Sequence, residues 1–424
     1  MVEKKFLLCY THIIGEKEMK QTPVKGTCDY LPSEMNVRDK MQQIILDTYK
    51  SCGYMHISTP ILEDIENLNK SDGGDNLNLI FKIQKRGDKF ENAIEQKDFE
   101  NLCDLGLRYD LTLPLSRFYA NNRDKLLAPF KCIQMDKVYR AERPQKGRMR
   151  EFVQCDIDIL GSDDRICEID LILTMSKTLK NLGLKNFSIR INDRQILKAL
   201  LEKFGFASEN FDTVCVTLDK LDKIGADGVK NELNAKEMPE SAIQKTIEFF
   251  GNAVTFERVE SELGENASCE SLKYIMNEVA KVDDVEIRFD PTLVRGQGYY
   301  TSTVFEIESK DYSCALGGGG RYDGLIGKFV GTPVPAVGFS IGFERIFSLL
   351  QNSANFDSKP MLALIVNEDN LTEGFTLAKD LRQNYVVSVL KAPNKVGKYL
   401  NKLKEAGFSL FINLCQGEDI KSLN

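Results

Sequence analysis

Residues 137–161, with the sequence KVYRAERPQKGRMREFVQCDIDILG, constrain the fold of this chain most, because two strand-like runs there flank a compact basic loop. In the second run, apolar and polar side chains alternate. Period-two alternation directs one set into a core and the other set to the opposite face of a strand. The apolar set is Val153, Cys155, Ile157 and Ile159, and the polar set is Gln154, Asp156 and Asp158. The segment therefore predicts a β-hairpin whose polar face is a candidate site.

Basic side chains crowd the loop of this hairpin. Guanidinium groups are permanently charged and bind oxygen atoms in pairs, so a cluster of them suits a polyphosphate ligand. A hairpin with a solvated basic tip explains the charges equally well, so on charge alone both interpretations stay open. The basic residues are Arg140, Arg143, Lys146, Arg148 and Arg150.

The order of residues in the hairpin favours the nucleotide site. From Tyr139 the chain reads Y-R-x-E-x-P-x-x-x-R-x-R-E-F-x-Q-x-D, which resembles the second signature of class II aminoacyl-tRNA synthetases in their histidine-specific branch. The resemblance implies that Arg140 is catalytic and holds the α-phosphate of ATP, and that Phe152 stacks on adenine. By the same resemblance, ATP contacts Glu142 and Arg148, and the substrate histidine faces Gln154 and Asp158.

Length and composition indicate a large multidomain protein. A chain of 424 residues with 42% hydrophobic content is expected to form two to four domains at roughly 100–200 residues each. No apolar run approaches the roughly 18 residues needed to span a bilayer, and the opening FLLCY is too short for the core of a signal peptide. The 11 cysteines are scattered without a C-x-x-C pair, which argues against a disulfide framework or a zinc site. We therefore expect free thiols, a cytoplasmic location and no membrane partner.

The net charge restricts the partners of the chain, and its histidines restrict its chemistry. A formal charge of −7 argues against a protein that coats DNA or RNA, so any contact with RNA must be local. His12 and His56 are the only histidines, and neither lies beside a serine, a cysteine or a carboxylate in a recognisable arrangement. Histidine-based acid–base or metal chemistry is therefore disfavoured, and we predict no metal-ligand set. Arginines and carboxylates must carry the reaction.

The N-terminal region combines an unmatched segment with a helix–strand unit. Residues 1–21 match nothing in the synthetase family, whose members usually begin just before a K-G-T-x-D-Y-x-P segment, so Met19 is a candidate start. An amphipathic helix is predicted between Ser33, a favourable N-cap, and Gly53, and the strand-like run YMHISTP follows it. Helix and strand together resemble the family's first signature, which builds the dimer interface. If the resemblance is set aside, the pattern predicts only an ordinary helix–strand unit.

Residues 107–115, LRYDLTLPL, contain candidate contacts to the amino acid. The run is typical of a strand edge that ends at a proline. The resemblance implies that Asp110 and Thr112 bind the α-ammonium group of the substrate. A carboxylate suits that role because a buried cation needs an opposite charge.

Residues 288–307, RFDPTLVRGQGYYTSTVFEI, contain the pattern L-V-R-G-x-x-Y-Y, which by resemblance is peculiar to the histidine-specific branch. Arg295 would be catalytic, contacting histidine and the α-phosphate opposite Arg140. Many relatives have Leu-Asp where this chain has Gln297 and Gly298. A strand entered through a glycine turn explains the glycines but not an arginine beside two tyrosines. The tyrosines that would line the imidazole pocket are Tyr299 and Tyr300.

Two glycine-rich segments follow. Residues 314–329, CALGGGGRYDGLIGKF, are not a P-loop, because no G-K-S or G-K-T follows the glycines. They resemble a family segment whose backbone packs close to histidine, with Tyr322 as a wall of the pocket; a flexible turn is the alternative. Residues 333–347, PVPAVGFSIGFERIF, predict a strand that passes into a helix. They resemble the third class II signature, in which Arg345 would lie over adenine and reach the γ-phosphate.

Two parts of the chain point to tRNA. Residues 194–285 are rich in helix formers and resemble an insertion that clasps the tRNA acceptor arm, although without a basic run a structural role fits equally well. Residues 360–424 alternate strands and helices and resemble the family's anticodon-binding domain. They stop earlier than expected, so this domain is interpreted as truncated, with its last strand left with an unpaired edge.

The resemblance implies an α+β fold: a class II synthetase antiparallel sheet flanked by helices, with a helical insertion domain and a C-terminal α/β anticodon-binding-like domain. The expected parts are residues 1–21 (unmatched extension), 22–193 (catalytic domain, first part), 194–285 (helical insertion), 286–350 (catalytic domain, second part), 351–359 (linker) and 360–424 (C-terminal domain).

The implied function is histidine–tRNA ligation by a homodimer. L-histidine and ATP, accompanied by Mg²⁺, would give histidyl-adenylate and pyrophosphate, and the histidine would pass to the 3′ end of tRNA(His), with Gln145 near the tRNA. The alternative is the non-catalytic, histidine-binding regulatory subunit of ATP phosphoribosyltransferase, which keeps the fold. That paralogue lacks the C-terminal domain and generally loses the arginine of L-V-R-G-x-x-Y-Y.

Overall fold

The computed structural model describes residues 19–423 except 71–77, 146, 296–298 and 352–358. Our predictions for the first 18 residues, for Lys146 and for the Gln297–Gly298 departure lie outside the described residues. The chain divides into two units, each described by itself. One comprises the residues up to Asp29 together with Gln42–Leu349, and the other comprises Tyr30–Met41 and Leu350–Asn424.

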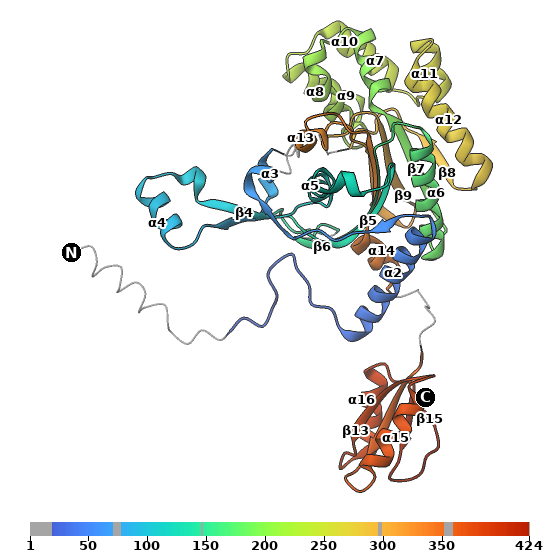
Figure 1. Cartoon of the computed structure of the whole chain (residues 1–424). Helices are drawn as coiled ribbons and strands as arrows, with labels where there is room; N and C mark the ends of the chain where they lie inside the picture. The colour runs from blue at the N-terminus through green and yellow to red at the C-terminus, as the bar shows by residue number, and fades with distance from the viewer. Residues whose placement is uncertain (1–18, 71–77, 146, 296–298, 352–358, 424) are drawn as a thin grey trace. The chain divides into compact units, whose positions relative to one another are not determined.

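An eight-stranded sheet forms the centre of the first unit (Figure 1). Its strand order is β1-β5-β6-β11-β10-β9-β7-β8; the inner pairs are antiparallel, and the outer pairs β1–β5 and β7–β8 are parallel. The predicted antiparallel sheet is thus confirmed. The strands are β1 (Met55–His56), β5 (Phe130–Tyr139), β6 (Glu151–Leu160), β7 (Phe187–Asp193), β8 (Glu286–Phe289), β9 (Thr303–Ser309), β10 (Tyr312–Arg321) and β11 (Ala336–Gly342).

The predicted hairpin is formed by β5 and β6, which pair along their whole length. The four apolar residues of the alternating pattern in β6 are buried, as the period predicts. Asp156 and Asp158 are buried as well. The polar face of β6 is therefore covered by other parts of the chain, which is unusual for carboxylates unless they serve a site.

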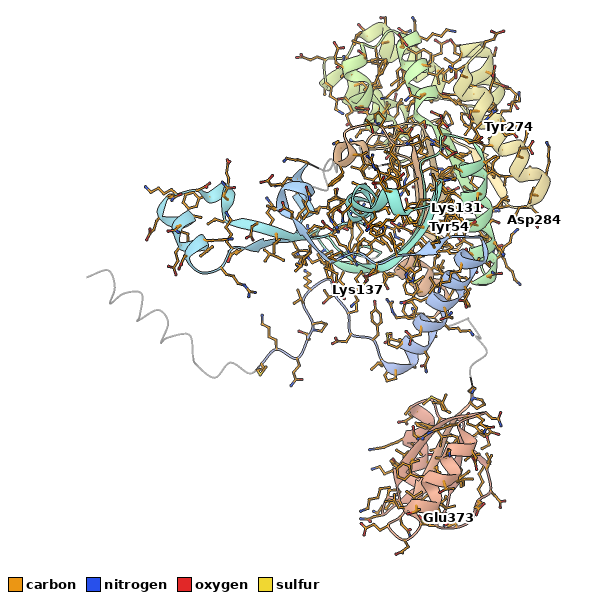
Figure 2. All side chains as sticks on the ribbon, in the orientation of Figure 1. Tyr54, Lys131, Lys137, Tyr274, Asp284 and Glu373 are labelled. Carbon is orange, nitrogen blue, oxygen red and sulfur yellow. The ribbon has the colours of Figure 1, made fainter. Side chains whose placement is uncertain are left out.

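Helices pack along this sheet. The helix predicted after Ser33 is present as α2 (Pro32–Ser51), and the hydroxyl of Tyr49 near its end donates 3.2 Å to a backbone carbonyl of β6. The ammonium of Lys131 on β5 forms a 2.7 Å ion pair with an aspartate of α6 and lies 4.3 Å from the ring centre of Tyr54 (Figure 2). The other helices around this sheet are α5 (Thr112–Asn122), α6 (Ile166–Asn181), α13 (Gly327–Val330), α14 (Phe343–Leu350) and the 3₁₀ turn Arg123–Lys125.

The chain between β1 and the start of α5 differs from two predictions. The YMHISTP run contributes only the two residues of β1, because the backbone carbonyl of Thr59 accepts a 2.8 Å hydrogen bond from the buried guanidinium of Arg108 instead of pairing with a strand. The strand edge predicted for residues 107–115 was wrong. β4 ends at Leu107, and Pro114 lies in the first turn of α5, where a proline is tolerated because those N–H groups have no intrahelical partner.

A small sheet and a group of helices complete the first unit. The small sheet has the order β2-β4-β3 and carries short helices beside it. These elements are β2 (Leu62–Asp64), α3 (Ile65–Asn69), β3 (Lys82–Gln84), α4 (Asp88–Glu95), the 3₁₀ turn Phe99–Asn101 and β4 (Cys103–Leu107).

Residues between β7 and β8 form helices, in keeping with their composition. Three of the helices start at a side chain that accepts a backbone N–H bond, a favourable N-cap: Asp193, Thr255 and Asn266. The helices are α7 (Arg194–Phe204), the 3₁₀ turn Ser208–Asn210, α8 (Phe211–Leu218), α9 (Leu221–Ala235), α10 (Glu240–Phe250), α11 (Phe256–Leu263) and α12 (Ala267–Val282).

The C-terminal part is a four-stranded sheet with the order β13-β12-β14-β15 between two helices. Alternate residues of β12 pack against α15 on one face and α16 on the other. The expectation of an unpaired edge on the last strand was wrong, because β15 folds back antiparallel onto β14. The elements are β12 (Met361–Val366), α15 (Leu371–Leu381), β13 (Val386–Lys391), α16 (Val396–Glu405), β14 (Leu410–Asn413) and β15 (Lys421–Ser422).

Two predictions that concern the whole chain can be compared with the described residues. Every described cysteine is a free thiol, as expected, and Cys9 lies outside the described residues. Within the described ranges, each helix is too short or too polar to span a bilayer.

Candidate active site

Direct cross-strand pairing aligns short and polar residues on one face of the central sheet. Gly338 on β11 pairs with Asp158 on β6, and Ser340 pairs with the preceding polar residue of β6. Gly318 on β10 lies between Ser340 and Glu306 of β9. Residues that pair directly share a face of the sheet. Because glycines lie between the polar residues, this face is hollow at the middle of the sheet.

A cavity of about 550 Å³ lies over this face. Its walls come from β6, β9, β10 and β11, from the hairpin loop, from the segment before β9, and from the starts of α5 and α14. The structure brings together every predicted site residue except Gln145. Those that line the cavity are Asp110, Thr112, Arg140, Glu142, Arg148, Phe152, Gln154, Asp158, Arg295, Tyr299, Tyr300, Tyr322 and Arg345.

Asp158 lies in a buried corner among tyrosines. The hydroxyl of Tyr322 donates a 2.6 Å hydrogen bond to its Oδ1. The ring of Tyr299 lies 5.9 Å from that of Tyr322 and 4.9 Å from that of Tyr300, measured between centroids. Burial raises the pKa of Asp158 to about 7, although the hydrogen bond from Tyr322 lowers it. A carboxylate in this setting can accept a hydrogen bond from the N–H of a small ring held between the tyrosines.

Glycines make the room for these groups. A Cβ at Gly338 would lie 1.9 Å from Oδ1 of Asp158, and a Cβ at Gly318 would lie 2.5 Å from the guanidinium carbon of Arg295. The glycine run of residues 317–320 is therefore part of strand β10 and is not a flexible turn, because neighbouring strands and side chains approach it on both faces.

Asp110, at the wall of the cavity, has a buried oxygen without a partner. Its Oδ1 accepts the backbone N–H of Leu113 at 3.2 Å, at the start of α5, whereas its Oδ2 is buried without a partner. Burial raises the pKa of this carboxyl, and the nearby charge of Arg140 lowers it. An unpaired buried carboxylate is costly, so the arrangement fits a cationic ligand.

Arginines dominate another part of the wall. The Nε of Arg140 donates to the carbonyl of Tyr109 at 3.0 Å, and its guanidinium lies 5.1 Å from the ring centre of Phe152. The Nε of Arg295 is buried without a partner. Burial lowers the pKa of Arg345, and the neighbouring guanidinium groups lower it further. Clustered, partly desolvated guanidinium groups fit an anionic ligand with several oxygens.

Sequence reasoning left several wall residues out of the site. Asp156 belongs to the alternating pattern of β6, so its signal was present. No sequence motif marked Glu306 or Ser340 as a site residue, because their position in the cavity wall depends on the register of the strands. Glu344 accepts the backbone N–H of Val153 at 3.3 Å. These wall residues are Asp156, Glu306, Ser340 and Glu344.

Two further predictions concern the edge of the site and metal ions. Gln145 does not line the cavity; it pairs with Arg148 through two backbone hydrogen bonds of 3.2 and 2.9 Å across the hairpin loop. Among the described residues, no group of three or more His, Cys, Asp or Glu side chains is placed to hold a metal ion.

Comparison with known proteins relates the chain to a family. The model of the family described as histidyl-tRNA synthetase matches residues 26–346. A histidine–tRNA ligase of Leifsonia xyli is 44% identical over 359 residues, which cover 80% of this chain and 82% of that protein. A probable histidine–tRNA ligase of Tropheryma whipplei is 39% identical over 416 residues, covering 93% of this chain and 96% of the relative.

Solved structures show the same fold at lower identity. The crystal structure of a histidyl-tRNA synthetase from Nostoc sp. PCC 7120 aligns with a TM-score of 0.79 at 24% identity and covers 96% of this chain and 95% of that one. A protein from Bacillus halodurans described as an ATP phosphoribosyltransferase regulatory subunit/histidyl-tRNA synthetase aligns with a TM-score of 0.76 at 21% identity, over 91% of this chain and 97% of that one.

Proposed function

This chain belongs to the histidyl-tRNA synthetase family, and from that membership and the cavity we propose which residues carry the reaction. Its function is that of a class II histidine–tRNA ligase, which activates L-histidine with ATP and transfers the histidine to tRNA(His). One observation supports the assignment of roles most strongly. Residues far apart in the sequence, from Leu79 to Arg345, line a single cavity with an acidic, tyrosine-walled part and an arginine-rich part.

Histidine is proposed to occupy the acidic part. The unpaired Oδ2 of Asp110 pairs with the α-ammonium group, with Thr112 beside it. Asp158 accepts the imidazole N–H, and its own hydrogen bond to Tyr322 fixes the direction of the carboxylate. Gln154 also lies in this wall, with its Oε1 buried and unpaired, and is free to accept a further N–H of the substrate.

ATP is proposed to occupy the arginine-rich part. Phe152 stacks on the adenine, Arg345 lies over its other face and reaches the γ-phosphate, and Glu142 and Arg148 complete the nucleotide contacts. Mg²⁺ is bound mainly by substrate phosphates and water in sites of this kind, with one or two carboxylates, which fits the lack of a three-carboxylate group among the described residues. Bound there, it would neutralise phosphate charge.

The chemical step follows from this placement. A carboxylate oxygen of histidine attacks the α-phosphorus of ATP, the bond from that phosphorus to the bridging oxygen breaks, and pyrophosphate leaves with the bonding electrons. Arg140 and Arg295 bind the α-phosphate oxygens, on which charge develops. Each preorganised donor of this kind stabilises the transition state by about 3–4 kcal/mol.

The tRNA contacts, the oligomeric state and the location are also proposals. The helices between β7 and β8 and the loop around Gln145 would contact the acceptor arm of tRNA(His), and the sheet of β12–β15 with its helices would contact the anticodon. We propose a homodimer built through α2 and β1, and a location in the cytoplasm. The free thiols of the described cysteines fit a reducing compartment.

The regulatory-subunit alternative has weaker support. Its support is a structural neighbour at 21% identity, whereas relatives named histidine–tRNA ligase reach 44% identity over most of the chain. The chain also has Arg295 and a C-terminal α/β sheet, the two features by which the family resemblance distinguishes a ligase from that paralogue.

Histidine-dependent exchange of pyrophosphate into ATP tests the proposal directly. Exchange is expected with L-histidine and not with any other amino acid, because the acidic part of the cavity is shaped by Asp158 and the tyrosines around it. Absence of exchange with histidine, at matched ATP and Mg²⁺, would contradict the proposed roles.

A further inference from the structure

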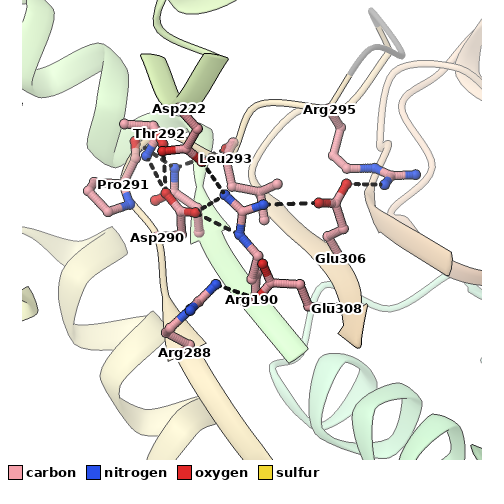
Figure 3. A network of polar contacts seen from close by, with 11 residues as sticks. Arg190, Asp222, Arg288, Asp290, Pro291, Thr292, Leu293, Arg295, Glu306 and Glu308 are labelled. Carbon is pink, nitrogen blue, oxygen red and sulfur yellow. Dashed lines mark hydrogen bonds and ion pairs between the residues drawn. The ribbon is translucent and has the colours of Figure 1, made fainter. Parts of the chain in front are cut away.

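One carboxylate of the cavity wall, that of Glu306, lies between two arginines. Oε2 of Glu306 accepts a 2.8 Å hydrogen bond from Nη1 of Arg295, and Oε1 accepts one of 3.1 Å from Nη1 of Arg190 (Figure 3). Glu306 and Arg190 pair directly across β9 and β7, so the strand register fixes their approach. Both oxygens of Glu306 are therefore engaged by guanidinium groups.

Arg190 is itself held in place by the segment that leads to Arg295. Its Nε donates to Asp290 at 2.7 Å, and Oδ1 of Asp290 in turn accepts the backbone N–H and the hydroxyl of Thr292 at 2.9 and 2.7 Å. The amide of Asn192 donates to the carbonyls of two further residues of this segment, each at 3.1 Å. Arg190 thus connects the segment before Arg295 with the strand after it (Figure 3).

Arg295 needs such support for two reasons. Its backbone φ of 64° lies in the left-handed region, where a residue with a side chain is strained, so the surroundings must hold it there. Its guanidinium also lies near that of Arg345, since its charge lowers the pKa of Arg345, and both residues line the cavity. Without an adjacent carboxylate, repulsion among these cations would favour other side-chain positions for Arg295.

We propose that Glu306, braced by Arg190, is a positioning residue for adenylate formation. It engages Nη1 of Arg295 and thereby fixes the guanidinium at the wall of the cavity, where the α-phosphate is to bind. The inference rests on the proposed role of Arg295. Glu306 itself contacts Arg295 and Arg190, and its part in the reaction is to hold the arginine fork in one orientation.

The test is a double-mutant cycle on the full chain, read by histidine-dependent pyrophosphate exchange and by single-turnover adenylate formation. Glu306→Gln keeps the size of the side chain and removes its charge. Glu308→Gln is the matched control: it lies two residues away on β9 and forms an ion pair with Arg288, but it has no contact with Arg295 among the bonds of the described residues. Each change is made in the parent and in an Arg295→Ala background.

In the parent, Glu306→Gln should lower kcat by about 10–100-fold, because a displacement of about 1 Å in a catalytic group can slow a reaction by about 10²-fold. The KM for histidine should stay within about threefold of the parent value. Glu308→Gln should change neither. In the Arg295→Ala background, Glu306→Gln should lower the rate by less than about threefold, because the group it positions is gone.

Two results would overturn the inference: a kcat of Glu306→Gln within threefold of the parent, or the same 10–100-fold loss in both backgrounds. If Glu306→Gln does not fold, Arg190→Lys provides the same cycle, because a lysine ammonium cannot bond Asp290 and Glu306 at the same time with the geometry of a guanidinium. The decrease in rate caused by Arg190→Lys should likewise disappear in the Arg295→Ala background. Failure of the proposed function would appear separately, as a parent protein without exchange.

Discussion

At the scale of single residues, the cavity holds buried polar atoms without a partner. Oδ2 of Asp110, Oε1 of Gln154 and Nε of Arg295 each lack a hydrogen bond. An unmade buried hydrogen bond costs about 1–3 kcal/mol, and more for a charged group. These unpaired atoms lower the stability of the folded chain, and they include both an acceptor suited to a cation and a donor suited to an anion, as the proposed site requires.

The unpaired Nε of Arg295 leads to a first prediction. Arg295→Ala should slow adenylate formation by about 10²–10³-fold, the usual loss for one preorganised donor to developing charge. Histidine binding, measured by calorimetry, should change little, since the acidic part of the cavity remains. A single-turnover rate within about threefold of the parent would show that Arg295 does not bind the transition state.

The raised pKa of Asp158 predicts a pH-dependent effect on stability. The folded protein holds the proton up to about pH 7, whereas an unfolded aspartyl group releases it near 3.8, so ionisation of this group destabilises the fold as the pH rises toward 7. Asp158→Asn removes this dependence while keeping an acceptor for Tyr322.

Urea unfolding of the parent and of Asp158→Asn at pH 6 and pH 8 measures the effect. The free energy of unfolding of the variant, relative to the parent, should be higher at pH 8 than at pH 6 by on the order of 1 kcal/mol. A difference between the two proteins that is the same at both pH values would mean that Asp158 ionises in the folded state as it does in water.

At the scale of elements, β10 shows what register adds to a sequence. Residues 317–320 are predicted equally well as a turn or as a close backbone approach, because glycine permits both. Because β9 and β11 pair with β10 on its two sides, these glycines form a strand and not a turn. Gly319→Ala tests this packing: its Cβ would lie 1.9 Å from the carbonyl oxygen of Gly338.

Gly324→Ala is a suitable control for that substitution, since a Cβ there meets nothing within 4 Å. Gly319→Ala should lower the free energy of unfolding by at least about 1–3 kcal/mol through overpacking, and Gly324→Ala should change it by less than about 0.5 kcal/mol. Equal denaturation midpoints for the two variants would contradict the packing described for β10.

Local pattern was sufficient for some elements and failed where distant contacts decide. The alternation in β6 and the helical spacing of α2 each follow from one period, and both were predicted. The start of α5 was missed because Pro114 suggests a strand end when the free N–H groups of a first helical turn are not considered. The roles of Glu306 and Ser340 could not be found, because each depends on strands separated by long stretches of sequence.

At the scale of the whole molecule, the residues that line the cavity and those proposed to contact the anticodon lie in different units. All residues that line the cavity belong to the unit that contains Gln42–Leu349. The sheet of β12–β15 lies in the other unit and carries exposed lysines on and beside α16. Changes there should therefore affect use of tRNA without affecting the activation of histidine.

Three of these lysines, Lys395, Lys398 and Lys402, follow helical spacing and are exposed. Changing all three to Glu should raise the KM for tRNA by about tenfold or more, equivalent to about 1.4 kcal/mol, and should weaken its dependence on salt. Pyrophosphate exchange should be unchanged. Changing all three to Arg keeps the charge and should keep the KM; a raised KM in both variants would point to altered folding of this sheet.

The glycine run of β10 also limits how the gene can change. Every missense change of one base in a glycine codon gives a residue with at least a Cβ. At each position from 317 to 320, that atom would come within 2.5 Å of a neighbour. Most non-synonymous changes in these four consecutive codons should therefore destabilise the product. A duplicate copy released from selection would be recognisable by substitutions in this segment.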